Sequence, residues 1–377
     1  MIKTVLFDVD GVLLSEEKYF DASALTVWEL LHSRNYLGLS PENFRTNYNE
    51  QEIKEIRSKV FVNDSILEFL KSRGLNANWD MIYLTFSFQL IWLLSQTGEK
   101  NLIEEWVDQP IKRDTLLKIG SLLIEKSVTL NFEAFIDEFP KFQQTKQGLM
   151  ECLDILVQKK LGIEKSTFIE KGSLWSICEH VSQEWYVGDD NVLQSTGRPS
   201  VQLGKKGFLN EERTLAPSAD IKSLFKQLDD ANISIGIGTG RPRLETIEPF
   251  DLLGWLPFFN ENHIITADDV LLAQKENPEG ESLSKPHPFT YVMAIMGRDK
   301  GIQSCLKKDL PLPSAEEILV VGDSLADLLA ARKIGCRFAA VLTGLTGEKA
   351  RETFDSNGAD FILDNVMDLK MLIEKGA

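Results

Sequence analysis

The sequence predicts an α/β protein with a doubly wound parallel sheet, into which a large all-helical segment is inserted after the first strand. From about residue 208 onward, short apolar runs alternate with helical stretches, an order typical of a parallel sheet covered by helices on both faces. One more apolar run lies at the N-terminus and ends in acidic residues. Between these regions apolar residues recur at spacings of three and four, the period of amphipathic helices.

The first strand is expected at residues 4–7, an apolar run typical of a buried parallel strand whose carboxyl end carries chemistry. Asp8 and Asp10 follow it two residues apart, so on an extended strand they would point the same way. Gly11 then permits a sharp turn. One carboxylate could act as a nucleophile while the other transfers a proton, although a strand ending in solvated acids has the same pattern.

The helical segment is expected to form a domain of its own at residues 16–207, with residues 1–15 and 208–377 making up the α/β core. A length of 377 residues suits two domains. Residues 81–96 carry no charge and approach the length of a membrane span, which needs about 20 apolar residues. Polar residues interrupt this run, so we expect a buried helix there.

Four further strands are expected in the second half of the chain. Their apolar runs lie at residues 233–238, 263–266, 318–322 and 338–342, with helical stretches between them such as 219–228 and 325–333. The first strand must join this sheet even though the whole helical segment separates it in sequence. The helical segment is therefore an insertion into the core.

Two later segments carry residues suited to binding phosphate. Thr239 and Gly240 follow the second strand, where a hydroxyl beside glycines can bind a phosphoryl oxygen, although glycines also mark plain turns. Lys285 lies in a loop stiffened by two prolines, where a rigidly held ammonium is a useful charge on phosphate. Most lysines, however, are simply exposed.

The next strand end offers ligands for a metal ion. Asp323 comes directly after an apolar run, and Asp327 follows one helical turn later on the same face. A carboxylate at this place suits magnesium, which prefers oxygen ligands. Aspartate also caps helices well, and the two roles can belong to different acids.

Four motifs, taken in chain order, resemble those of the haloacid dehalogenase superfamily, specifically its aspartate-nucleophile phosphatases. They are Asp8-x-Asp10-Gly11-Val12, Thr239, Lys285-Pro286 and Gly322-Asp323-x-x-x-Asp327. The resemblance covers residues 1 to about 15 and about 208 to 377, and residues 335–360 look like relatives of phosphoglycolate phosphatase. It implies a Rossmann-like core with a helical cap, which here is much larger than the family's usual compact bundle.

The resemblance implies a magnesium-dependent phosphatase, a phosphoric monoester hydrolase that acts on a small phosphorylated metabolite. Asp8 would attack phosphorus and form an aspartyl-phosphate. Asp10 would protonate the leaving oxygen and then activate water. The metal ligands would be the Asp8 carboxylate, the Asp10 backbone carbonyl and Asp323.

The resemblance also implies how the substrate is held. Thr239, Gly240 and Lys285 would bind the transferring phosphoryl group, and Asp327 would orient Lys285 or a metal-bound water. Specificity is expected to come from the helical cap. Candidate cations for contact with the substrate are Arg198, Lys205, Lys206 and Arg241.

Two other functions stay open. A sugar phosphomutase has the same motifs but returns the phosphoryl group to a bound substrate, so its products would distinguish it. A non-catalytic binding protein could use the same fold. The complete set of acids favours an enzyme, because a degenerate relative would be expected to lose Asp8 or Asp10.

The net charge and the composition limit the classes of partner that the protein is expected to bind. A formal net charge of −16 argues against wide contact with nucleic acid or an anionic membrane, but not against a small anionic substrate. The N-terminus lacks the apolar stretch of a signal peptide, and the four cysteines form no metal-binding pattern. We therefore expect a cytoplasmic protein, with a homodimer as an open alternative to a monomer.

Overall fold

The structure, a computed structural model, describes residues 1–73, 75, 77–139, 146–164, 167–278 and 280–374. The chain divides into two compact units. The core unit comprises Met1–Glu16 and Leu209–Ala377, and the helical unit comprises Glu17–Phe208. Each of these boundaries lies one residue from the position expected from the sequence.

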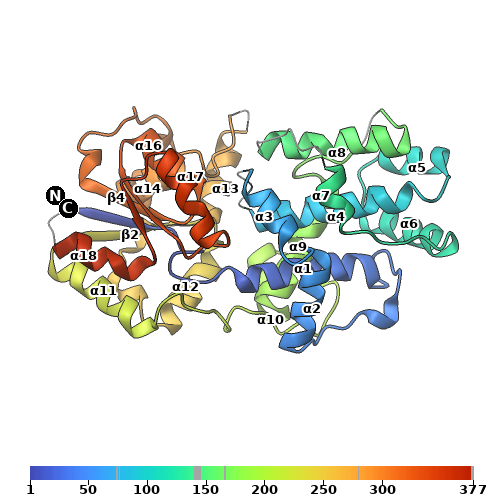
Figure 1. The fold of residues 1–377 in the computed structure, drawn as a ribbon, viewed down its shortest axis with the longest axis horizontal. Helices are drawn as coiled ribbons and strands as arrows, with labels where there is room; N and C mark the ends of the chain where they lie inside the picture. The colour runs from blue at the N-terminus through green and yellow to red at the C-terminus, as the bar shows by residue number, and fades with distance from the viewer. Residues whose placement is uncertain (74, 76, 140–145, 165–166, 279, 375–377) are drawn as a thin grey trace. The chain divides into compact units, whose positions relative to one another are not determined.

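The core unit contains a six-stranded sheet in which all neighbouring strands pair in parallel, in the order β3-β2-β1-β4-β5-β6 (Figure 1). The strands are β1 Thr4–Phe7, β2 Ser234–Gly238, β3 Ile264–Ile265, β4 Ile318–Gly322, β5 Arg337–Val341 and β6 Phe361–Leu363. The sequence predicted the first five; β6 was missed because its apolar run has only three residues. The strand order reverses beside β1, and in open parallel sheets ligands bind at the carboxyl ends of the strands at this point.

Helices cover both faces of the sheet, which confirms the doubly wound fold class. They are α11 Ser218–Asp230, α12 Arg243–Leu252, α13 Ala267–Glu276, α14 Phe289–Met296, α15 Ile302–Leu306, α16 Leu325–Ile334, α17 Arg351–Ser356 and α18 Leu369–Glu374. Short 3₁₀ segments connect them, at Leu256–Phe258, Glu261–His263, Arg298–Lys300, Ala315–Glu317, Gly347–Ala350 and Val366–Asp368.

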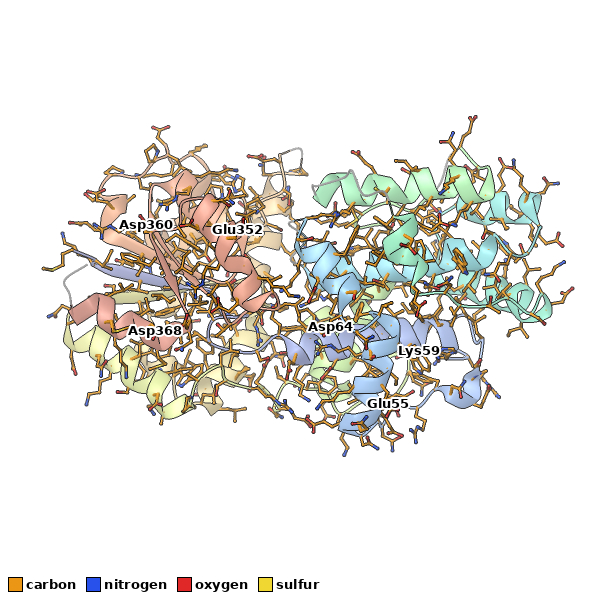
Figure 2. The ribbon with its side chains drawn as sticks, viewed as in Figure 1. Glu55, Lys59, Asp64, Glu352, Asp360 and Asp368 are labelled. Atoms are coloured by element: carbon orange, nitrogen blue, oxygen red, sulfur yellow. The ribbon has the colours of Figure 1, made fainter. Side chains whose placement is uncertain are left out.

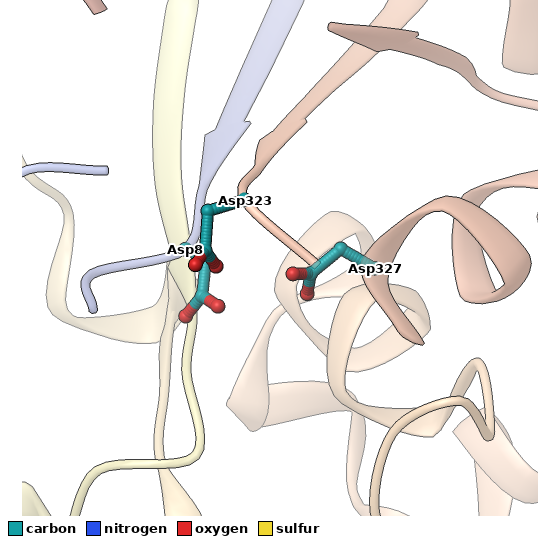
Figure 3. A group of neighbouring side chains, drawn as sticks. All are labelled: Asp8, Asp323 and Asp327. Atoms are coloured by element: carbon teal, nitrogen blue, oxygen red, sulfur yellow. The ribbon is translucent and has the colours of Figure 1, made fainter. Parts of the chain in front are cut away.

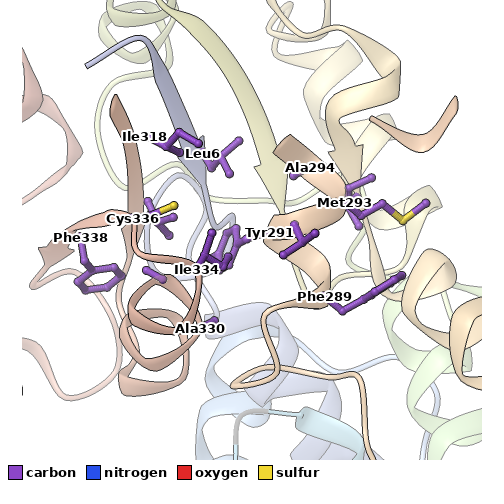
Figure 4. Packing of buried hydrophobic residues seen from close by; sticks show 14 of the residues in the cluster. Leu6, Phe289, Tyr291, Met293, Ala294, Ile318, Ala330, Ile334, Cys336 and Phe338 are labelled. Atoms are coloured by element: carbon purple, nitrogen blue, oxygen red, sulfur yellow. The ribbon is translucent and has the colours of Figure 1, made fainter. Parts of the chain in front are cut away.

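Two hydrophobic clusters fill the spaces between the sheet and these helices. Successive side chains of a strand point to opposite faces, and β1 shows this directly. Val5 and Phe7 belong to a cluster with residues of α11, α12 and α18. Leu6 belongs to the other cluster, with residues of α14 and α16 such as Tyr291 and Ile334 (Figure 4). β1 is therefore buried on both faces, as its uninterrupted apolar run predicts.

The helical unit contains ten α-helices within the residues that the structure describes. They are α1 Glu17–His32, α2 Glu50–Val60, α3 Ser65–Lys71, α4 Asn78–Leu94, α5 Lys100–Val107, α6 Arg113–Glu125, α7 Ala134–Glu138, α8 Lys146–Leu161, α9 Ser173–Val187 and α10 Asp189–Thr196, with a 3₁₀ segment at Pro41–Asn43. Helix α1 is central, because it packs against α2, α4 and α9 and all its residues except Glu17 are buried.

Helix α2 shows why the three- and four-residue spacing predicts helices. Its apolar residues Ile53, Ile56 and Val60 are buried. Glu55 and Lys59 are exposed (Figure 2). Such a helix is stabilised by burying one apolar stripe while its charged side stays in water.

The uncharged segment 81–96 lies mostly in α4, where nearly every residue is buried. Helices α8 and α9 pack against α4. The prediction of a buried helix is thus confirmed. No helix in the described part of the chain is both long and apolar enough to span a membrane.

Candidate active site

Three carboxylates meet at the carboxyl ends of β1 and β4, which are neighbours in the sheet. Asp8 follows β1 and Asp323 follows β4, while Asp327 lies in the first turn of α16 and points toward them (Figure 3). Each contributes an oxygen atom to a group in which all such atoms lie within 4.8 Å of one another. The backbone N–H of Asp8 donates to the carbonyl of Val321 at 2.9 Å, so the sheet itself sets its position.

Asp8, the candidate nucleophile, is buried. Its side chain accepts a hydrogen bond from the N–H of Val9 at 2.7 Å and lies 3.1 Å from Nζ of Lys285. Burial raises the pKa of Asp8 to about 7, against the opposing effect of Lys285. The charges of Asp327 and Asp10 raise it further. A metal cation bound beside Asp8 would favour the ionised form of this carboxyl, which is the form that can attack phosphorus.

Lys285 joins two of the carboxylates. Its Nζ lies 2.7 Å from Asp327 Oδ1 in addition to its contact with Asp8. Burial alone would lower the pKa of Lys285, but Asp327 and Asp8 hold it above its ordinary value. Asp327 also accepts hydrogen bonds from the hydroxyls of Tyr291 at 2.7 Å and Ser324 at 2.6 Å. The Asp327 carboxylate is therefore held in a fixed orientation, from which it can orient Lys285.

Two glycines make room for the Asp323 carboxylate. A Cβ atom on Gly11 would lie 2.3 Å from Asp323 Oδ2, and one on Gly344 would lie 2.0 Å from the same atom. Gly11 also has a φ of 71°, a conformation that side chains disfavour. The hydroxyl of Thr343 donates to the Gly11 carbonyl at 2.5 Å and ties these segments together.

This group of residues fits a magnesium ion. Three carboxylates face one ammonium group, so the cluster has an excess of negative charge that a divalent cation would balance. Asp327 is held by Lys285, Ser324 and Tyr291. Asp8 and Asp323 are then the natural hard oxygen ligands.

Asp10 is held differently from Asp8. β1 ends at Phe7, so neither Asp8 nor Asp10 lies within the strand. Among the residues that the structure describes, Asp10 does not belong to the group of three carboxylates. Its Oδ1 instead accepts hydrogen bonds from Nε of Arg241 at 2.8 Å and Nη2 at 2.6 Å. Burial raises the pKa of Asp10 to about 6, although Arg241 opposes the shift.

Two of the residues expected to bind phosphate, Thr239 and Gly240, follow β2, which is the other neighbour of β1. Thr239 is buried, and its backbone N–H donates to the Ile265 carbonyl at 3.0 Å. Its hydroxyl accepts the N–H of Arg241 at 3.1 Å. Gly240 is exposed, and a Cβ atom there would meet nothing within 4 Å, which leaves its backbone approachable.

Comparison with known proteins identifies the family. A HAD-hydrolase-like family model matches residues 282–369. An X-ray structure from the Northeast Structural Genomics Consortium, target ZR25, is 37% identical, with a TM-score of 0.80 over 99% of this chain and 98% of that one. The chain belongs to the haloacid dehalogenase superfamily. The resemblance inferred from the four sequence motifs is therefore confirmed.

Other members of this superfamily are more distant. The pyrophosphatase PpaX of Bacillus pumilus is 28% identical over 149 residues, which is 40% of this chain and 56% of that protein. The chain thus matches little more than half the length of this curated relative. A putative β-phosphoglucomutase from Thermotoga maritima covers 100% of both chains at 13% identity, but its TM-score of 0.41 is too low to bear on activity.

Haloacid dehalogenase motifs did not reveal every residue of the site. Tyr291 lies within an apolar helical stretch, where an aromatic residue is usually part of the core. Glu212, which pairs with Arg241, is one of two neighbouring acids in a connecting segment and carries no motif signal. Gly344 lies in the run Thr-Gly-Leu-Thr-Gly at residues 343–347. The sequence shows the glycine, but its close approach to Asp323 depends on the tertiary fold.

The raised pKa of Asp8 predicts how stability depends on pH in the metal-free protein. A carboxyl whose folded-state pKa lies above its ordinary 3.8 stabilises the fold at low pH, and this contribution is lost as pH rises through about 7. We therefore expect the melting temperature of metal-free wild-type protein to fall further between pH 5 and 8 than that of Asp8→Asn. Equal falls, measured by circular dichroism with chelator present, would contradict the raised pKa.

Proposed function

We propose that this protein is a magnesium-dependent phosphatase, a phosphoric monoester hydrolase that acts on a small phosphorylated metabolite through an aspartyl-phosphate on Asp8. The observation that carries the proposal is the group formed by Asp8, Asp323 and Asp327 with Lys285, of which Asp8 and Asp327 are buried. It combines a nucleophile with a cation and with ligands for a second positive charge. Phosphoryl transfer depends mainly on such positioning and electrostatic stabilisation.

In the first step, a carboxylate oxygen of Asp8 forms a bond to phosphorus while the bond to the leaving oxygen breaks. Asp10 gives its proton to that oxygen. The Lys285 ammonium, which lies 3.1 Å from Asp8, would contact an oxygen of the transferring group. Magnesium, when held by Asp8, Asp323 and the Asp10 carbonyl, supplies the positive charge that lets two anions approach.

In the second step, water attacks the phosphorus of the aspartyl-phosphate. Asp10 accepts a proton from this water, inorganic phosphate leaves, and the Asp8 carboxylate is regenerated. Thr239, with the exposed backbone of Gly240, is suited to hold the phosphoryl oxygens through both steps. Asp10 thus acts as an acid in the first step and as a base in the second.

The helical unit is the expected source of substrate specificity, although its candidate cations differ in availability. Lys205 is buried and pairs with Glu29 at 2.8 Å and with Glu184. Arg198 pairs with Glu179 at 3.0 Å. Lys206 is exposed. Two of the candidate cations in this unit therefore already serve ion pairs within it.

The proposal is tested by measuring inorganic phosphate released from a panel of phosphorylated metabolites. The panel should include pyrophosphate, because PpaX is named a pyrophosphatase. We expect release from at least one compound with magnesium and none with excess chelator. Chelator-resistant release, or no release from any compound, would contradict the proposal. Formation of an isomeric sugar phosphate without net release would favour a phosphomutase instead.

A further inference from the structure

Arg241 has a fully buried guanidinium group whose hydrogen bonds account for all five of its N–H groups. Nε and Nη2 donate to Asp10 Oδ1 at 2.8 and 2.6 Å. Nη1 donates to Glu212 Oε1 at 2.5 Å and to the Glu245 carbonyl at 3.3 Å, and Nη2 also reaches Glu212 Oε2 at 3.4 Å. A substrate phosphate could reach this guanidinium only by displacing one of these acceptors. The arrangement therefore suits a residue that positions another residue.

The backbone around Arg241 is also fixed. Its carbonyl accepts the N–H of Ala267 at 2.8 Å, and its N–H donates to the Thr239 hydroxyl at 3.1 Å. Arg241 thus extends from the rigid end of β2 toward Asp10. A planar guanidinium held in this way loses little further freedom when it binds a carboxylate.

Glu212 and Asp10 lie on the two segments that connect the core unit to the helical insertion. These segments pair with each other inside the core unit, where Ser15 N–H donates to the Arg213 carbonyl at 2.8 Å and Leu215 N–H donates to the Leu13 carbonyl at 3.1 Å. The Glu212 side chain is only 5% exposed. Glu212 is therefore held in a fixed place from which it can orient Arg241.

Both bonds from Arg241 to Asp10 fall on the same oxygen, Oδ1. Oδ2 receives no hydrogen bond from Arg241, so it is the oxygen that remains to exchange a proton with a substrate. The Asp10 side chain is 21% exposed and lies beyond the end of β1, where the sheet no longer restricts it. Without Arg241, its carboxylate would be free to rotate.

We propose that Arg241 and Glu212 form a positioning pair, which holds Asp10 through Oδ1 so that Oδ2 can protonate the leaving oxygen. The inference rests on the proposed phosphatase function and adds to it two residues that act through Asp10. Neither of them is a catalytic residue, because neither touches the reacting atoms. Misplacing a catalytic group by about 1 Å can cost on the order of 10²-fold in rate.

The test compares two substrates that differ in their need for an acid. An alkyl phosphate such as glycerol phosphate needs a proton on its leaving oxygen, whereas p-nitrophenyl phosphate has a good leaving group and needs it far less. The ratio kcat/KM includes only the steps up to leaving-group departure, so the later role of Asp10 with water does not enter. We expect Glu212→Gln to lower kcat/KM about tenfold or more for the alkyl phosphate, but less than about threefold for p-nitrophenyl phosphate.

Arg243→Lys is the matched control. Arg243 lies two residues from Arg241 but pairs with Glu261 at 2.6 Å, away from Asp10. We expect Arg243→Lys to leave the ratio of the two kcat/KM values, alkyl phosphate to p-nitrophenyl phosphate, unchanged. Arg241→Lys loses the planar guanidinium group and should change this ratio as Glu212→Gln does. Glu212→Asp retains the charge and should recover part of the loss.

A double-mutant cycle separates positioning from general damage. In an Asp10→Asn background, Glu212→Gln should have no further effect on the alkyl phosphate, because the residue through which it acts is already changed. Equal losses on both substrates, or a full effect without Asp10, would overturn the inference. If Glu212→Gln does not fold, Glu212→Asp and Arg241→Lys give the same comparison. Inactivity of the wild-type protein would instead refute the proposed phosphatase function.

Discussion

Asp8→Asn is expected to abolish magnesium-dependent phosphate release, with a loss on the order of 10⁴-fold or more in kcat. The amide is a poor nucleophile, so the covalent intermediate cannot form. The change is nearly isosteric and removes a negative charge from a group of three carboxylates, two of which, Asp8 and Asp327, are buried. The variant should therefore fold at least as well as the wild-type protein when no metal is bound.

Two measurements check this expectation. The first is phosphate release from the preferred substrate, and the second is detection of a covalent phosphoenzyme after rapid acid quenching. Asp364→Asn is a suitable control, because Asp364 is an exposed carboxylate of the core unit that pairs with Arg351. If Asp8→Asn kept the wild-type rate, Asp8 could not be the nucleophile.

Lys285→Met is expected to lose both activity and stability. Lys285 lies 3.1 Å from Asp8 and 2.7 Å from Asp327, and all three side chains are buried. Removing the ammonium leaves two buried carboxyls without their cation, which typically costs about 3–5 kcal/mol. The transferring phosphoryl group would also lose a positive charge, so we expect kcat to fall about 10²-fold or more.

A second substitution separates these two effects. The double variant Lys285→Met/Asp327→Asn removes the Asp327 carboxylate charge together with the Lys285 ammonium charge. The side-chain carbonyl of the asparagine can still accept a hydrogen bond from the Tyr291 hydroxyl. We expect the double variant to regain much of the lost melting temperature but little of the lost activity. Recovery of activity together with stability would show that Lys285 serves only to balance charge.

The sequence was most informative at the carboxyl ends of the strands. The runs before Asp8 and Asp323 are continuous and apolar because both faces of β1 and β4 are buried, so strands and acids could be located together. The four motifs then predicted that segments far apart in the chain meet at one edge of the sheet. Burial of Asp8 and its contact with Lys285 agree with that expectation.

Side-chain partners beyond the motifs could not be predicted. Two-residue spacing suggested that Asp8 and Asp10 point together, but the strand ends before both acids, and Arg241 binds one of them. Arg241 also pairs with Glu212, which lies on one of two connecting segments that pair with each other. Pairing between residues so far apart in sequence leaves no local pattern to read.

The central place of β1 has a consequence for the order in which the chain folds. Thr4 is in register with Ser234 and Ile318, so β1 stays without either sheet partner until most of the protein has been synthesised. The helices of Glu17–Phe208 rely on contacts closer in sequence and can form earlier, as domains made first generally do. Closing such long loops around β1 makes assembly of the sheet the slow event. We therefore expect the candidate active site, which needs both neighbours of β1, to be among the last parts of the molecule to form.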